Sequence, residues 1–211
     1  MARTPYQKAD EAAARITTKV RREFRHNRLA LFDELNIVQT KKHVHKLYKT
    51  INKIVKQEFM EIINEIYQTI YDEAVGMGFD GDIRNLDEAW IEEFFDSYNP
   101  VTKYVFSNEI DRKESRLFEA LVSNELERLK SYAYAERLIT TQIEQYAIDL
   151  EDAIAKVVYE DTKVEKVMWV AEKDDRTCGV CSELDGQIFD LVAVPPKQHY
   201  QCRCYFVPVK E

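Results

Sequence analysis

The sequence predicts a mainly α protein, an elongated helical body of long amphipathic helices followed by a small β-rich unit at the C-terminus. Only five Gly and five Pro occur in 211 residues, and so few chain breakers favour long helices over many short strands. Apolar residues recur at steps of three and four up to about residue 160, and β-branched and aromatic residues follow Asp161. We therefore expect two domains, residues 1–160 and residues 161–211.

The first helix is expected to begin near Thr4-Pro5, since Thr can cap a helix and Pro is tolerated in the first turn. It should continue through the segment that ends in LALFDEL. The residues predicted to form its apolar face are Ile16, Val20, Phe24, Leu29, Leu31 and Phe32.

The second helix has the clearest pattern, with apolar residues at steps of three and four over about ten turns, as an amphipathic helix requires. It should run to Ala74 and end in a loop with Gly76, Gly78 and Gly81, because Gly tolerates positive φ. The apolar positions are Val44, Tyr48, Ile51, Val55, Phe59, Ile62, Ile66 and Ile70.

A short helix around Trp90 and Phe95 should follow, and Asn99-Pro100 should stop it. Helices are expected to resume from about Asn108 and to reach Glu160. Their apolar positions are consistent with packing against the long second helix.

Three short segments define the expected β-rich unit. VEKVMWVA has strand composition, and Asp185-Gly186 in LDGQIF is typical of a two-residue β-hairpin turn. CYFVPV should form a final strand, in which Pro208 marks a sheet edge because it cannot donate a ladder hydrogen bond.

Charge is distributed unevenly along the chain. Residues 1–60 hold 14 Lys/Arg and 6 Asp/Glu, whereas residues 61–100 hold eleven acids and one base, within a net charge of −8. The basic third could contact nucleic acid through phosphates without sequence preference, or it could simply be a solvated helix face. The candidate nucleic-acid residues are Arg15, Lys19, Arg21, Arg22, Arg25 and Arg28.

Neither a membrane span nor an export signal is expected. No apolar run approaches the roughly 20 residues that cross a bilayer, and MARTPYQKADEAAAR lacks the apolar centre of a signal peptide. We expect the protein to be made in a reducing cytoplasm, where disulfides are rare.

All four cysteines lie in the C-terminal unit, with one histidine beside the second pair. The spacing, C-x2-C followed by H-x2-C-x-C, suits tetrahedral zinc. A unit this small also needs a staple, and zinc can supply on the order of 10 kcal/mol. Two disulfides or free thiols are the alternatives. The candidate ligands for a closed structural site are Cys178, Cys181, His199, Cys202 and Cys204.

The pattern supports none of three catalytic sites, so we expect no enzyme. A redox C-x-x-C begins a helix after a strand, whereas the residues after Cys181 predict a turn. None of the upstream histidines is followed by Glu as in the H-x-E of zinc deaminases. No G-x-S-x-G nucleophile motif occurs.

Taken together, the C-terminal motifs resemble the Mu F-like family, the phage head morphogenesis domain of tailed bacteriophages. The resemblance covers about residues 137–209, although Thr140-Thr141-Gln142 stands where the family often has Arg-Thr-Glu. The matching residues are Trp169, Asp174 or Asp175, Arg176, Cys178, Cys181, Leu184, Asp185, Gly186, Pro195, Pro196, His199, Cys202, Arg203 and Cys204.

The resemblance implies a minor capsid protein of the virion, assembled in the bacterial cytoplasm and located inside the head or at the portal vertex. It implies partners among the portal and major capsid proteins, and packaged DNA as a further contact. The implied role is head assembly with DNA packaging or delivery. The alternative function is a zinc-knuckle regulatory protein that binds nucleic acid. It would need basic or aromatic side chains around the cysteines, and the bases there are mixed with acids.

Overall fold

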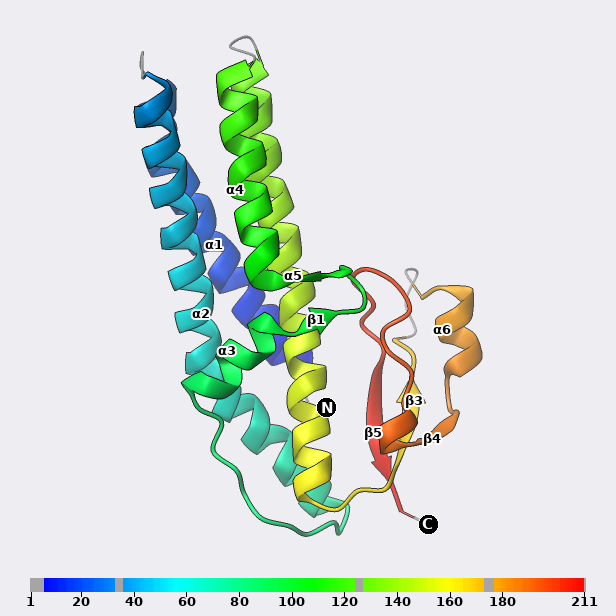
Figure 1. The fold of residues 1–211 in the computed structure, drawn as a ribbon. Helices are drawn as coiled ribbons and strands as arrows, with labels where there is room; N and C mark the ends of the chain where they lie inside the picture. The colour runs from blue at the N-terminus through cyan, green and yellow to red at the C-terminus, as the bar shows by residue number, and fades with distance from the viewer. Residues whose placement is uncertain (1–5, 33–35, 124–126, 173–176, 211) are drawn as a thin grey trace.

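The computed structural model describes residues 6–32, 36–123, 127–172 and 177–210 (Figure 1). The expected helix start at Thr4-Pro5 lies outside these residues, as do Asp174, Asp175 and Arg176. The side chains of Leu29, Leu31 and Phe32 are also outside what the structure describes.

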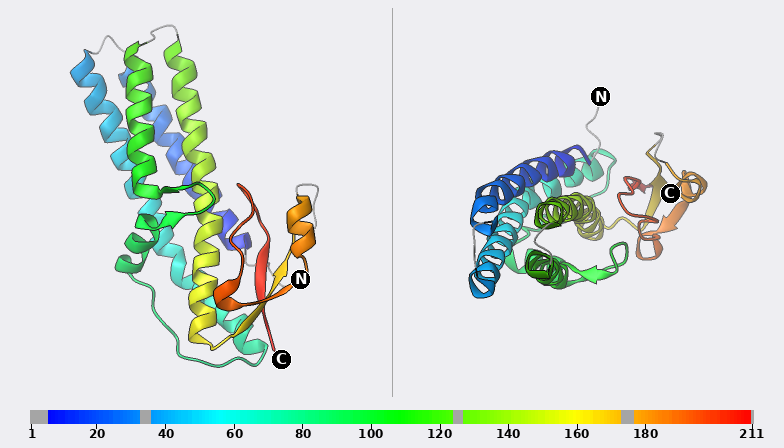
Figure 2. Two further views of the ribbon diagram at one scale, coloured as in Figure 1. Left: turned by 45° about the vertical axis from the view of Figure 1, so that its right-hand side comes forward. Right: turned by 90° about the horizontal axis from the view of Figure 1, so that it is seen from above.

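The expected mainly α architecture is confirmed. In the described part of the chain, four long helices lie side by side and a small three-stranded sheet lies next to the last of them (Figures 1 and 2). In chain order the elements are α1 (Tyr6–Phe32), α2 (Ile37–Gly76), α3 (Glu88–Asp96), β1 (Tyr98–Asn99), β2 (Tyr104–Val105), α4 (Phe106–Ser123), α5 (Arg128–Asp161), β3 (Lys166–Val170), α6 (Gly179–Leu184), β4 (Ile188–Asp190), the 3-10 helix η2 (Leu191–Ala193) and β5 (Tyr205–Val209).

The apolar stripes read from the sequence form the core of the bundle. α1 packs against α2 and α5, and α4 packs against the same two helices from another side. Ile16, Val20 and Phe24 of α1 are completely buried, and the Phe24 ring packs edge-on against Tyr132 of α5. No described helix is long and apolar enough to cross a membrane.

The start of α2 is set by a capping box. The Asn36 side chain accepts from the Gln39 backbone N–H at 3.0 Å, and the Gln39 side chain accepts from the Asn36 N–H at 3.2 Å. This reciprocal pair satisfies two donors that a helix N-terminus would otherwise leave unpaired. At the other end, Gly78 adopts φ +87°, as expected for a Gly that follows a helix.

The loop after α2 is tied to the end of α5. A Cβ at Gly81 would lie 1.8 Å from the Asp161 carbonyl oxygen, so only Gly fits this approach. Arg84 pairs with Asp161 at 2.6 Å, and Tyr67 of α2 donates to the same carboxylate at 2.7 Å. The C-terminal parts of α2 and α5 are therefore joined.

The C-terminal sheet is antiparallel, with strand order β4-β3-β5. β3 is the central strand, and its Val167 and Trp169 are buried. β5 is an edge strand, as Pro208 predicted. Tyr159 near the end of α5 donates to the Phe206 carbonyl and packs edge-on against its ring, which fixes the sheet to the bundle.

The expected β-hairpin at Asp185-Gly186 is wrong. Helix α6 precedes this turn, and the strand after it, β4, pairs with β3 across an excursion that includes α6. Gly186 does adopt φ +78°, and its N–H donates to the Trp169 carbonyl at 2.8 Å. The dipeptide signals a turn correctly, but the turn alone does not determine which elements flank it.

One carboxyl group is buried among the helices and has no hydrogen-bond partner where the structure describes the chain. Glu151 of α5 is 2% exposed, and neither of its carboxylate oxygens has a hydrogen-bond partner among the described residues. Burial, with smaller contributions from Asp152, Asp10 and Glu73 against an opposing one from Lys197, raises the pKa of Glu151 to about 9. The side chain is therefore protonated at neutral pH.

We predict that Glu151 makes the protein less stable at higher pH. Between the ordinary pKa of 4.5 and the raised value of about 9, the unfolded chain loses this proton and the folded chain keeps it. The free energy of unfolding should therefore fall as pH rises through this window, by up to about 1.4 kcal/mol per pH unit. Urea unfolding of E151Q should show a flatter pH profile than the parent. The exposed control E160Q should keep the parent profile, and identical slopes for all three proteins would contradict the prediction.

Candidate metal centre

Cys178 and Cys181 are positioned by helix α6. Cys178 is its N-cap residue, with an extended φ of −79° and ψ of 163°, and its Sγ accepts from the Cys181 N–H at 3.4 Å. The sulfur thus takes the place that a Ser or Asp oxygen usually fills at a helix start. The expectation that C-x2-C leads to a turn and not to a helix is therefore wrong. The following Ser-Glu-Leu continues the helix until Asp185.

The second set of candidate ligands comes from the segment that enters β5. The Cys202 N–H donates to the His199 carbonyl at 3.2 Å, which closes a turn. Gln201 within it adopts φ +57°. Because of this turn, His199 and Cys202 face the first pair, and Cys204 follows two residues later along an extended segment.

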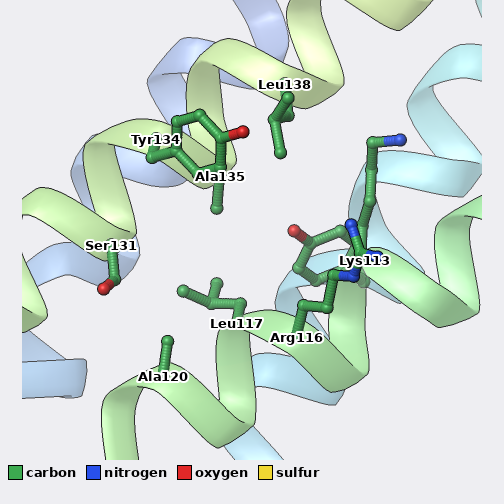
Figure 3. Close-up of a pocket in the computed structure, with 9 residues that line it drawn as sticks. Lys113, Arg116, Leu117, Ala120, Ser131, Tyr134, Ala135 and Leu138 are labelled. Carbon is green, nitrogen blue, oxygen red and sulfur yellow. The ribbon is translucent and has the colours of Figure 1, made fainter. Parts of the chain in front are cut away.

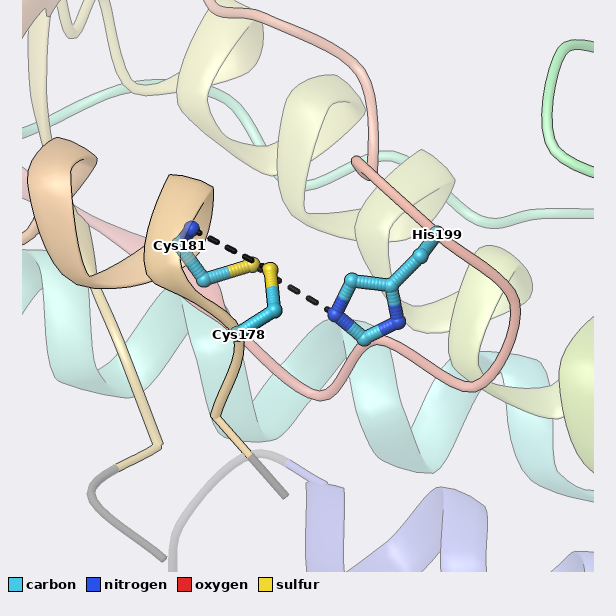
Figure 4. Close-up of side chains that lie close together, drawn as sticks. All are labelled: Cys178, Cys181 and His199. Atoms are coloured by element: carbon cyan, nitrogen blue, oxygen red, sulfur yellow. Dashed lines mark hydrogen bonds between the residues drawn. The ribbon is translucent and has the colours of Figure 1, made fainter. Parts of the chain in front are cut away.

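The five candidate ligands converge. Cys178, Cys181 and His199 have ligand atoms within 4.8 Å of one another, and so do Cys181, Cys202 and Cys204. Cys181 Sγ lies 3.6 Å from His199 Nε2 and 3.5 Å from Cys202 Sγ. A tetrahedral site with Zn–S bonds of about 2.3 Å separates its sulfurs by about 3.8 Å. Figure 4 shows the imidazole directed at the two sulfurs of the first pair.

The histidine ring is held in the orientation that a metal ligand needs. Its Nδ1 lies 2.9 Å from the Tyr200 carbonyl oxygen, to which it donates. This hydrogen bond assigns the lone pair to Nε2, the atom that faces Cys181. Metal-binding histidines commonly use their second nitrogen in this way.

The sulfurs differ in their surroundings. Cys181, Cys202 and Cys204 are buried, whereas Cys178 is half-buried. All four are free thiols. Burial and the neighbouring thiols raise the pKa of Cys181. The Cys181 backbone N–H lowers the pKa of Cys178. A cation would offset the repulsion between adjacent thiolates and would displace their protons on binding.

Helix α5 holds the second ligand segment through a polar relay. Gln145 is completely buried, and its Oε1 accepts from the Gln201 backbone N–H. Its Nε2 donates to Asp149 at 2.9 Å, and Asn99 donates to the same carboxylate at 2.5 Å. Burial raises the pKa of Asp149 to about 6, although these two hydrogen bonds oppose the rise. Sequence patterns missed the relay because Gln145 and Asp149 lie among the apolar residues of α5.

A second contact joins α5 to the segment just before His199, which contains Pro195 and Pro196. The Lys197 side chain is 4% exposed and pairs with Asp152 at 3.1 Å, and its Nζ lies 6.0 Å from the centre of the Trp169 ring. The ligand segment is thus packed on the bundle as well as on the sheet.

The candidate nucleic-acid residues do not form one free basic surface. Arg15 pairs with Glu58 at 2.8 Å, and Lys19 contacts the same carboxylate. Although burial of Glu58 opposes it, these two cations hold the pKa of Glu58 below its usual range. Arg21 lies 3.8 Å from Glu136. The remaining three candidates, Arg22, Arg25 and Arg28, are exposed on α1.

These observations describe a class of protein, a helical bundle with a compact Cys/His unit attached to its last helix. Residues 118–207 match the family described as Phage Mu protein F like protein. This match confirms, for that part of the chain, the resemblance to the phage Mu F-like family noted from the sequence. At a coarse level, the match supports a protein of the phage head morphogenesis type.

One curated relative also matches. An uncharacterized protein of Haemophilus influenzae is 26% identical over 118 residues, which cover 51% of this chain and 26% of the relative. The chain therefore spans about a quarter of the length of that relative. No solved structure matches.

We predict that the purified protein binds about one zinc ion per chain, measured by elemental analysis after preparation under reducing conditions. C181S should weaken zinc binding more than any other single Cys-to-Ser change, because Cys181 belongs to both ligand groups. The loss of zinc affinity on removing a ligand should exceed the roughly 10–100-fold loss that follows removal of a group hydrogen-bonded to a ligand. The exposed histidine variant H45A should bind zinc like the parent. Absence of zinc from the parent, or two disulfides in its intact mass, would refute the metal site.

Proposed function

We propose that this protein is a minor capsid protein of a tailed bacteriophage, acting in head assembly and in DNA packaging or delivery at the portal or the inner capsid surface. The observation that carries the proposal is the Mu F-like match over residues 118–207, which coincides with the Cys/His unit and with the helix that supports it. The proposed partners are the portal protein and the major capsid protein.

In this proposal the metal is structural zinc, held by four of the five candidate ligands. The cluster joins α6 to the segment before β5, two parts of a sheet unit that is otherwise small. A closed site stabilises such a unit and leaves no open position for a water nucleophile. The division into a body of residues 1–160 and a metal unit of residues 161–211 stays part of the proposal.

The role in the virion can be tested by inactivating the gene in the phage that carries it. We expect heads that fail to form correctly or that do not package or deliver DNA, seen by electron microscopy and by measurement of protected DNA. The parent gene should restore infectious particles, whereas C181S should not, and H45A should serve as the matched control. Full infectivity without the gene, with this protein absent from purified virions, would defeat the proposal and would favour the regulatory alternative.

The contact with packaged DNA is proposed for three exposed arginines of α1, Arg22, Arg25 and Arg28. Phosphate contacts of this kind are salt-dependent and independent of sequence. Arg15 and Lys19 are less suited, because Glu58 already neutralises part of their charge.

We predict weak duplex binding that falls steeply with salt, measured by fluorescence anisotropy between low and physiological ionic strength. Replacing Arg22, Arg25 and Arg28 by Ala should reduce the slope of log affinity against log salt by up to roughly three units, about one for each arginine that no longer neutralises a phosphate. The paired control, R15A with K19A, should change the slope less. A slope that the triple variant leaves unaltered would remove DNA from the partners of α1.

A further inference from the structure

A groove separate from the metal centre runs along α4 and α5. It consists of a cavity of about 230 Å³ between the two helices and a wider one of about 590 Å³ beside β2 and Tyr200. The two cavities share Lys113, Tyr134 and Leu138 in their walls, so they form one continuous surface, which we call the α4–α5 groove.

The smaller cavity is an apolar anchor site. Its walls include Leu117 and Ala120 from α4 and Ala135 and Leu138 from α5, and Figure 3 shows these side chains around the hollow. The volume fits one large aliphatic or aromatic side chain. Apolar pockets of this type are where interfaces place their strongest contacts.

The rim of the groove is cationic although the chain is acidic. Its walls contain four cations, Arg112, Lys113, Arg116 and Arg137, against one acid, Glu109, in a protein of net charge −8. Glu109 is 4% exposed and accepts from Lys113 at 2.6 Å and from Arg112 at 2.8 Å.

The two outer cations are available to a partner. Arg116 and Arg137 are exposed, and neither forms an ion pair within the described residues. They lie on α4 and α5, one on each side of the groove. The groove therefore offers a surplus of positive charge around an apolar centre.

Some buried polar side-chain atoms in the groove walls have no hydrogen-bond partner among the described residues. They include the hydroxyl of Tyr48, which is completely buried, the hydroxyl of Thr102, and Oε1 of Gln142, which is 2% exposed. Gln142 uses its Nε2 to donate to Glu109 at 3.1 Å, so its free oxygen can only accept. Buried groups normally find partners, so the Gln142 oxygen points to a ligand that supplies a donor, whereas the hydroxyls can donate or accept.

Exposed tyrosines surround the groove, as is common at protein interfaces. Tyr104, Tyr134 and Tyr200 are 43%, 62% and 42% exposed, and all three border the wider cavity. The Arg112 guanidinium lies 4.4 Å from the centre of the Tyr104 ring. Tyr and Arg are the residues that interfaces enrich.

We infer that the α4–α5 groove binds an acidic peptide segment of a partner protein, with a bulky apolar side chain in the anchor site and carboxylates against Arg116 and Arg137. The charge complementarity selects an acidic occupant. The acceptor-only Gln142 oxygen favours a peptide, whose backbone N–H can donate, over a nucleic-acid backbone, whose phosphates only accept. The inference supplies the chemistry of a partner for the proposed head-assembly role and rests on it for the partner's source.

The test uses the full-length protein and an array of 15-residue peptides in which the central residue and the flanking charge vary independently. The central residue is Trp, Phe, Leu or Ala, and the flanks are Glu, Gln or Lys. We expect retention only with a bulky centre and Glu flanks. For the best peptide, titrated in solution, R116E with R137E should lower the affinity at least about tenfold, and A120W, which fills the anchor site, should lower it similarly. K46E, an exposed change on α2, should bind like the parent.

Equal binding by all variants, or retention that ignores the central residue, would overturn the inference. So would tighter binding of a thymidine 20-mer that displaces the peptide, which would assign the groove to single-stranded DNA. If the parent protein binds no peptide but self-associates, and R116E with R137E abolishes the self-association, the groove would be assigned to a second copy of the chain. That result would also overturn the inference. Failure here leaves intact the virion defect expected on gene loss, so the two proposals can fail separately.

Discussion

The packing of α5 is the constraint on which the rest of the structure depends. One side of this helix completes the bundle with α1, α2 and α4, while another side holds the C-terminal sheet through Tyr159 and the ligand segment through Gln145 and Asp152. A helix that must serve both neighbours cannot be a simple amphipathic one. Its buried residues accordingly include Gln142, Gln145 and Glu151 among the apolar ones.

These buried polar groups have different consequences according to how they are satisfied. Gln145 is fully engaged, so it holds the ligand segment in place. Gln142 is satisfied on one side only, which leaves an acceptor in the groove. Glu151 has no hydrogen-bond partner in the described part of the chain and remains protonated instead. Desolvation without a hydrogen bond is costly, and each group meets that cost in a different way.

The sequence was most informative where a single repeating pattern determines the structure. The stripe from Val44 to Ile70 became the buried face of α2, and the spacing of the cysteines predicted which side chains meet. It was least informative where the outcome depends on tertiary partners. Helix α6 was missed because its N-cap is a thiol and because an Asp-Gly pair follows it, and the pairing of Arg15 with Glu58 joins residues 43 positions apart. The groove could not be predicted either, since its walls come from four separate elements.

The relay from Asn99 through Asp149 and Gln145 to Gln201 has a mechanical consequence. It links the short β1–β2 ribbon, one turn of α5 and the loop that carries the imidazole into one hydrogen-bonded chain. The ribbon, with Tyr104 in its second strand, and the loop that carries His199 therefore have one common attachment on α5.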